Sequence, residues 1–495
     1  IALDRLGGAR LAMGNAQAAL EAYQEAMAIA RELQAADPTA RNARRDVWLS
    51  HDKLGEVYRR LGRTQEALQA YEQAMVIAQA LARENPEDTQ AQRDLSLCHE
   101  RIGDIRLILG RTEEALQAYQ AGMEIGQRQA AAHADSAQAL RDLSVGWDKL
   151  GGVYLKLNRT SEALQAYQRS LETSRLLAQK EPQNAQFQRD LSIGYDRLGD
   201  VYLDLGRKDD ALASYEAAMK IGRELAAKDP LNAGAQYDLA AGHSKLGNAR
   251  LAAGKAEEAL ADYTAALQIL KRLREADPAD AAVARSISVL GNKVAAAQLL
   301  LGRTPEAIRS FEEAADVAGQ LAAKDPHNQQ VQRDLGVSRF QAMAAYRAAG
   351  DLANWRKAAD EAVAQFEAVL AAAGGSPDAK QDLVHALAEA AAGAAALPGA
   401  APDDLRVALS RIRRAIQLSG RTDSAHLETE AALLALTGDP AAAVAALEKA
   451  LSLLPKDQPG QPPGSEETRK RLQERLLLYR DAAQGSRGTR DAPKP

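Results

Sequence analysis

Apolar and small residues recur along this chain at helical spacing, and the whole pattern repeats every 48 residues. Large aromatic residues mark the period most clearly: Tyr23, Tyr71, Tyr119, Tyr167, Tyr215, Tyr263 and then Phe311. A fixed period of this size is typical of a stacked array, in which one unit cannot bury its apolar face alone. The sequence therefore predicts an array of one supersecondary unit over about residues 1–365.

Each unit carries start and stop signals for two helices. Residues that cap helix N-termini form one column: Asp88, Ser136, Asn184, Asn232, Asp280, Asn328 and Ser376. Residues that tolerate a left-handed backbone form another: Gly14, Gly62, Gly110, Asn158, Gly206, Gly254, Gly302 and Gly350. The pattern therefore predicts a helix, a tight turn and a second helix in each unit.

Small residues stand where the two helices must approach each other closely. In the second unit these are Gly55 and Ala67, and most other units repeat both positions. A large side chain at either position would push the helices apart. Trp355 stands in the alanine column of the eighth unit, which predicts different packing there.

The second unit resembles the tetratricopeptide repeat through Leu54, Gly55, Tyr58, Gly62, Ala67, Tyr71 and Ala74. The resemblance implies an all-α fold: a right-handed superhelical solenoid of antiparallel helix pairs, with about eight 48-residue repeats and degenerate C-terminal pairs. The usual unit of the family has about 34 residues, and the 14 extra residues make about four helical turns. We place two extra turns on each helix, which gives helices of about 20 residues. Such extended arrays resemble those of large bacterial signalling proteins.

The pattern weakens beyond the array. We expect a degenerate repeat over 366–422, a shorter tetratricopeptide-like pair over 423–454, a linker over 455–465, a capping helix over 466–484 and a disordered tail over 485–495. A cap is expected because the last apolar face of a solenoid needs a cover.

Charge and cysteine content exclude several classes of protein. The net charge is −5, so no overall basic field indicates nucleic acid or an anionic membrane. Cys98 is the only cysteine, which excludes an internal disulfide and a cysteine-based zinc site. No run of 18 apolar residues occurs. We therefore expect no metal, no membrane and no nucleic acid as partners, and a cytoplasmic location.

No residue constellation indicates catalysis or a cofactor. His51, His99 and His243 share one column with Trp147 and Tyr195. Adjacent copies lie on alternate helices, more than about 8–10 Å apart, so one ion cannot reach two of them. The column is therefore interpreted as a packing position for bulky side chains. We expect a non-enzymatic protein without cofactors.

In the family, the first helix of each pair lines an inner groove, and the resemblance implies the same here. Acidic, basic and leucine columns follow one stripe of these helices. The predicted partner-binding residues are Asp52, Lys53, Glu56, Glu100, Arg101, Asp104, Leu107, Asp148, Lys149, Leu155, Asp196, Arg197, Asp200, Leu203, Lys245 and Leu251. These charges either contact a ligand or pair with each other between repeats, and the sequence leaves both interpretations open.

A second set of charges is interpreted as structural. Arg-Asp dipeptides recur near the start of the first helix at residues 45–46, 93–94, 141–142, 189–190 and 333–334. Acids near a helix N-terminus interact favourably with the helix dipole.

These observations favour a scaffold that binds protein or peptide partners with basic and aliphatic side chains. An alternative is the regulatory arm of a larger bacterial signalling enzyme, a kinase or a nucleoside triphosphatase, whose catalytic domain lies upstream. The chain opens at Ile1 inside a repeat, which favours a piece of a longer protein.

Overall fold

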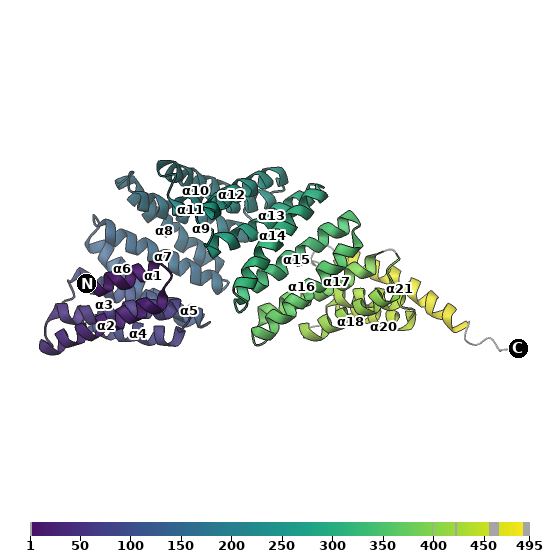
Figure 1. The fold of residues 1–495 in the computed structure, drawn as a ribbon, viewed down its shortest axis with the longest axis horizontal. Coiled ribbons are helices and arrows are strands. Elements are labelled where there is room, and N and C mark those ends of the chain that lie inside the picture. The colour runs from purple at the N-terminus through teal and green to yellow at the C-terminus, as the bar shows by residue number, and fades with distance from the viewer. Residues whose placement is uncertain (1, 398, 421–422, 455–464, 489–495) are drawn as a thin grey trace. The chain divides into compact units, whose positions relative to one another are not determined.

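The computed structural model describes residues 2–397, 399–420, 423–454 and 465–488, which form helices and no strand. The chain divides into two compact units, residues 1–254 and 255–495. Unit 1 contains α1 (Ala2–Ala12), α2 (Ala16–Ala36), α3 (Arg41–Arg60), α4 (Thr64–Glu84), α5 (Thr89–Ile108), α6 (Thr112–Ala132), α7 (Ala137–Lys156), α8 (Thr160–Lys180), α9 (Ala185–Asp204), α10 (Lys208–Lys228) and α11 (Ala233–Ala252) (Figure 1). Unit 2 contains α12 (Ala256–Ala276), α13 (Ala281–Leu300), α14 (Thr304–Lys324), α15 (Gln329–Ala349), α16 (Leu352–Ala372), α17 (Pro377–Ala396), α18 (Pro402–Ser419), α19 (Ser424–Leu436), α20 (Pro440–Leu453) and α21 (Ser465–Gly488).

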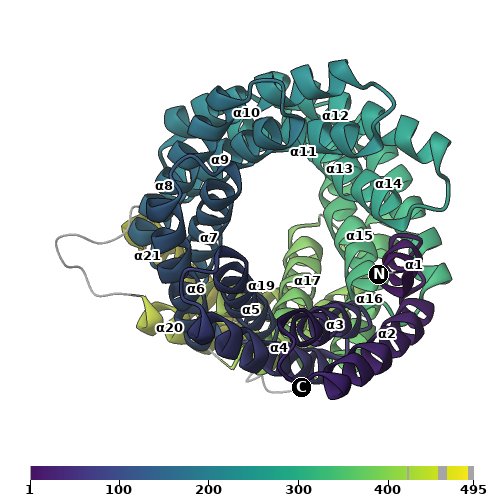
Figure 2. The ribbon, with the colours of Figure 1, turned by 90° about the vertical axis from the view of Figure 1, so that its left-hand side faces the viewer.

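Helix pairs of nearly constant length build unit 1. From α3 to α10, the first helix of each pair has 20 residues and the second has 21. The first helices α3, α5, α7, α9 and α11 begin 48 residues apart. Figure 2 shows α5, α7, α9 and α11 on the inner side of the curve that unit 1 makes, with α6, α8 and α10 on its outer side. The expected all-α architecture of paired helices is confirmed.

The predicted caps and turns are present. Asp88 accepts hydrogen bonds from the backbone N–H groups of Gln90 and Ala91, and the other N-cap residues of its column bond in the same way. The turn glycines have positive φ, for example +74° at Gly110. Asn158, with φ of +57°, is the only non-glycine residue with positive φ in the described part of the chain. The sequence signals therefore mark the helix ends correctly.

Asn158 provides a direct test of the turn geometry. We expect Asn158→Ala to destabilise unit 1 by about 1 kcal/mol, because alanine tolerates the left-handed region poorly. Asn158→Gly should be neutral or slightly stabilising, since glycine adopts positive φ at no steric cost. Urea unfolding followed by circular dichroism measures both variants. Equal midpoints for the alanine and glycine variants would show that the turn does not need a left-handed residue.

The tyrosine column packs on the glycine column. A Cβ atom added at Gly103 would lie 2.6 Å from Cε1 of Tyr119, and the same overlap recurs between Gly55 and Tyr71. The pattern also holds for the pairs Gly7–Tyr23, Gly151–Tyr167 and Gly199–Tyr215. Each tyrosine of these pairs is almost completely buried. The small residues of the first helix therefore make room for an aromatic ring of the second helix.

Unit 2 replaces this contact by another in the region where the repeat pattern weakens. Trp355 of α16 is buried, and a Cβ atom added at Gly393 of α17 would lie 2.5 Å from its ring. A tryptophan fits in the alanine column because the next first helix offers a glycine. This is the different packing that the sequence predicts.

The C-terminal helix covers the last pair. Leu472 and Leu476 of α21 belong to one buried cluster with Leu427 of α19 and Leu447 of α20. α21 continues to Gly488, four residues beyond the predicted end at residue 484. Residues 455–464 of the predicted linker and 489–495 of the predicted tail lie outside the described residues.

Candidate functional site

All sixteen predicted partner-binding residues lie on the first helices of unit 1. α3 carries Asp52, Lys53 and Glu56; α5 carries Glu100, Arg101, Asp104 and Leu107; α7 carries Asp148, Lys149 and Leu155; α9 carries Asp196, Arg197, Asp200 and Leu203; α11 carries Lys245 and Leu251. These helices form the inner side of the unit in Figure 2. We call this set of sixteen residues the inner surface.

Most inner-surface charges pair between repeats, and the pairing alternates. Arg101 Nε lies 3.4 Å from Asp52 Oδ1, and Arg197 repeats this contact with Asp148 at 3.2 Å. In the intervening repeats a lysine pairs instead with an acid further along the preceding first helix. The two lysine pairs are Lys149–Asp104 at 2.6 Å and Lys245–Asp200 at 2.7 Å. The pattern of contacts therefore repeats every 96 residues, not every 48.

Tyrosine hydroxyls join the lysine pairs. Tyr119 donates a hydrogen bond of 2.7 Å to Asp104, and Tyr215 donates one of 2.6 Å to Asp200. The sequence pattern predicts only a packing role for these tyrosines. An aspartate 15 residues before the tyrosine signals this second role. In the repeat of Tyr167, the equivalent position is Gly152, so no such hydrogen bond can form.

Two inner-surface acids, Glu100 and Asp196, form no ion pair with a described residue and lie at equivalent positions two repeats apart. Burial raises the pKa of Glu100 to about 7, although Lys149 and Arg101 oppose the shift. Burial likewise raises the pKa of Asp196 to about 6, opposed by Lys245 and Arg197. Asp196 Oδ1 is buried and accepts no hydrogen bond from any residue that the structure describes. These carboxylates are the least satisfied charges of the inner surface.

The leucine column contributes to packing between repeats. Leu107 packs against the buried cluster around Tyr119 and Leu150. Leu155 and Leu203 make equivalent contacts one and two repeats further on. All three are only partly buried, so each also offers some apolar surface to solvent.

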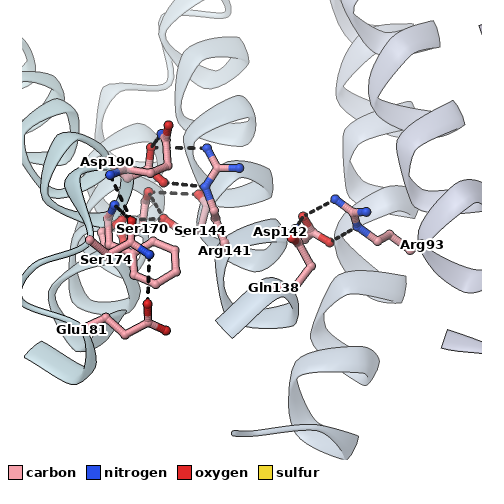
Figure 3. A network of polar contacts seen from close by, with 12 residues as sticks. Arg93, Gln138, Arg141, Asp142, Ser144, Ser170, Ser174, Glu181 and Asp190 are labelled. Atoms are coloured by element: carbon pink, nitrogen blue, oxygen red, sulfur yellow. Dashed lines mark hydrogen bonds and ion pairs between the residues drawn. The ribbon is translucent and has the colours of Figure 1, made fainter. Parts of the chain in front are cut away.

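The Arg-Asp dipeptides form an ion-pair ladder, as Figure 3 shows for Arg93–Asp142 and Arg141–Asp190. Each arginine binds both carboxylate oxygens of the aspartate one repeat ahead. The ladder of unit 1 comprises Arg45–Asp94, Arg93–Asp142, Arg141–Asp190 and Arg189–Asp238, and unit 2 has Arg285–Asp334 and Arg333–Asp382. The structural interpretation is confirmed, but the helix-dipole argument is wrong. The aspartates lie beyond the first helical turn and bind the preceding repeat instead.

The histidine column is a packing position in the structure. His51 and His99 are partly buried, and burial lowers the pKa of both, that of His51 to about 4. The Arg169 guanidinium lies over the ring of Trp147, which belongs to the same column. Arg169 Cζ is 4.6 Å from the centroid of that ring. Over the described residues, no group of three histidine, cysteine or acidic side chains is arranged to hold a metal ion. No described helix is long and apolar enough to cross a membrane.

Comparison with protein families identifies the repeats. Family models described as tetratricopeptide repeat match residues 44–108, 147–181 and 194–223. The chain carries tetratricopeptide repeats. All three matched segments lie in unit 1 and cover helices that bear the inner surface. Tetratricopeptide repeats support a role as an interaction scaffold or sensor with protein or peptide partners, and their fold is typically non-catalytic.

Solved structures with tetratricopeptide repeats resemble this chain at low identity. A signal transduction ATPase with a tetratricopeptide repeat sensor from Pyrococcus horikoshii is 14% identical, over 78% of this chain and 52% of that chain, with a TM-score of 0.47. A putative kinesin light chain with TPR-like repeats from Podosopora anserina is 18% identical, over 46% and 95%, with a TM-score of 0.35. At these values the similarity carries no functional argument. No curated protein matches the sequence significantly.

Proposed function

We propose that unit 1 binds an extended basic peptide along the inner surface, and that the chain acts as a non-enzymatic scaffold. The observation that carries this proposal is the pair of unsatisfied acids, Glu100 and Asp196. The inner surface has seven carboxylates and five cations; ion pairs between repeats occupy four of the cations, and the fifth, Lys53, lies 3.8 Å from Asp52 of its own helix. A surplus of acid on a partly apolar surface suits lysine or arginine side chains flanked by aliphatic residues.

The spacing of the two acids limits the partner. Neighbouring packed helices lie about 8–10 Å apart and the first helices are alternate helices, so two repeats separate the acids by at least roughly 16–20 Å. An extended peptide advances about 3.3–3.6 Å per residue. Two basic residues at least five or six positions apart therefore match Glu100 and Asp196. A cytoplasmic location stays a prediction from the sequence.

Fluorescence anisotropy with a labelled peptide tests the proposal. The peptide carries two lysines six positions apart with leucines between them, and variants place the lysines three positions apart or replace them by glutamate. We expect the first peptide to bind best and its affinity to fall as salt increases. Glu100→Gln combined with Asp148→Asn should weaken binding about tenfold, the effect of roughly 1.4 kcal/mol.

The chain offers a matched control on the outer helices. Glu72 of α4 and Glu172 of α8 are exposed acids outside the inner surface. Glu72→Gln with Glu172→Gln removes the same charge and should leave binding unchanged. Equal losses in the two double variants would show that only net charge matters and would refute binding at the inner surface.

A further inference from the structure

A cavity of about 620 Å³ lies between α9, α10 and α11, within the extra turns that lengthen these repeats. Its wall includes Ile193 and Asp196 of α9, Met219 and Leu225 of α10, and Leu239 of α11. The volume falls in the range of ligand pockets, about 300–1,000 Å³. The wall is mainly aliphatic and contains no aromatic ring.

Two other repeats place larger or hydrogen-bonded side chains in the equivalent space. Between α3, α4 and α5, Trp48 is buried and donates a hydrogen bond to Cys98 Sγ. Between α7 and α8, Ser144 bonds to Ser170 and Ser174, as Figure 3 shows. The α9–α10–α11 repeat has smaller residues at three of these positions: Ser192 for Trp48, Gly222 for Ser174 and Gly242 for Cys98. The α5–α6–α7 repeat carries the same small residue types at Ser96, Gly126 and Gly146, so these three positions do not by themselves account for the cavity.

Asp196 supplies the one partly buried charge of the wall without a partner, since Asp229, the other wall acid that forms no ion pair with a described residue, is exposed. The other charged pair, Arg189 and Asp238, is internally neutral, with Arg189 Nε 2.5 Å from Asp238 Oδ2. The cations nearest to Asp196 are also engaged: Lys245 binds Asp200 and Arg197 binds Asp148. Lys228, at the wall, donates to Gln183. An unpaired buried carboxylate is costly, and an entering cation would relieve that cost.

We propose that this cavity binds a primary alkylammonium group, with Asp196 as its counter-charge and the aliphatic wall around its methylene chain. An ammonium is a compact charge on a flexible alkyl stem and suits a lone carboxylate in an aliphatic wall, whereas a planar guanidinium needs a matching fork of acceptors. A quaternary ammonium would need aromatic rings, which the wall lacks. The group can come from a free amine or from a lysine side chain of a bound peptide.

The inference rests partly on the proposed function, because Asp196 belongs to the inner surface. Isothermal titration calorimetry with 1-aminopentane examines the cavity alone, and 1-pentanol is the neutral control. The second ligand is acetyl-Ala-Leu-Lys-Leu-Ala-amide, with norleucine replacing lysine as its control. We expect 1-aminopentane, the lysine peptide or both to bind, and neither control to do so. Binding of the peptide alone would assign the site to lysine side chains.

Two variants and one control decide the assignment. Asp196→Asn should weaken binding about tenfold to hundredfold, because it removes a charged hydrogen-bond acceptor. Ser192→Trp keeps the carboxylate and should abolish binding by filling the cavity, as Trp48 does in its repeat. Asp204→Asn removes an exposed acid from the same helix and should change nothing.

Titrations near pH 6 in two buffers of different ionisation enthalpy add an independent readout. Because a bound cation favours the ionised carboxylate, binding should release protons from the unmodified protein and none from Asp196→Asn. Absence of binding by both amines, or equal affinity in Asp196→Asn, would overturn the inference. The proposed function would still be tested separately by Glu100→Gln with Asp148→Asn, which alters no residue of the cavity wall.

Discussion

Gly103→Ala is expected to destabilise unit 1 by about 1–3 kcal/mol, the usual cost of overpacking. The new Cβ atom would lie 2.6 Å from Cε1 of Tyr119 and 2.9 Å from two further ring atoms. Helix propensity alone predicts the opposite sign, since alanine is favoured over glycine inside a helix by about 1 kcal/mol. The midpoint of urea unfolding, followed by circular dichroism, measures the effect.

Gly126→Ala is the matched control. Gly126 lies in α6 of the same repeat, and no atom stands within 4 Å of the position that its Cβ would take. This substitution should stabilise the protein by about 0.5–1 kcal/mol. If both variants were stabilised, the ring of Tyr119 would not pack on Gly103, and the explanation of the glycine column would be wrong.

Glu100→Gln should have the second large effect, a pH-dependent gain in stability. The pKa of Glu100 is raised from 4.5 to about 7, first by burial and then by Asp142 and Asp104, while Lys149 and Arg101 act in the opposite direction. The folded state therefore binds the proton more tightly than the unfolded state. The resulting stability is complete below about pH 4.5 and is lost as the pH rises through 7.

The glutamine variant cannot ionise, so it avoids this loss. At pH 8 it should be more stable than the unmodified protein by on the order of 2 kcal/mol, and near pH 4 the two should be about equal. Glu72→Gln, at an exposed site on α4, should show no such pH dependence. A pH-independent difference between Glu100→Gln and the unmodified protein would refute the raised pKa.

Local signals in the sequence predicted the helices and turns because each signal acts within a few residues. Caps such as Asp88 and turn residues such as Asn158 fix helix ends through their own backbone contacts. The 48-residue period then extended these local assignments along the array. The placement of two extra turns on each helix agrees with the observed lengths of 20 and 21 residues.

The charge pairing could not be predicted from one column at a time. Arg101 and Lys149 occupy the same column, yet they bind acids at two different positions of the preceding first helix. Which acid is within reach depends on side-chain length and on the register between helices that are 48 residues apart in sequence. The 96-residue alternation appears only when neighbouring columns are compared together.

The cavity between α9, α10 and α11 could not be predicted from the sequence either, because it also depends on contacts between helices. Its wall has small residues at Ser192, Gly222 and Gly242, but the α5–α6–α7 repeat has the same residue types at the equivalent positions. The sequence gives no measure of whether neighbouring side chains close such a space.

Photo-cross-linking of a bound peptide tests the central claim, binding at the inner surface, most directly. The lysine–leucine peptide would carry photoleucine between its two lysines, and mass spectrometry would locate the cross-links. The account predicts cross-links on α5, α7 and α9, with losses in Glu100→Gln combined with Asp148→Asn. Cross-links confined to the outer helices α6, α8 and α10 would contradict it.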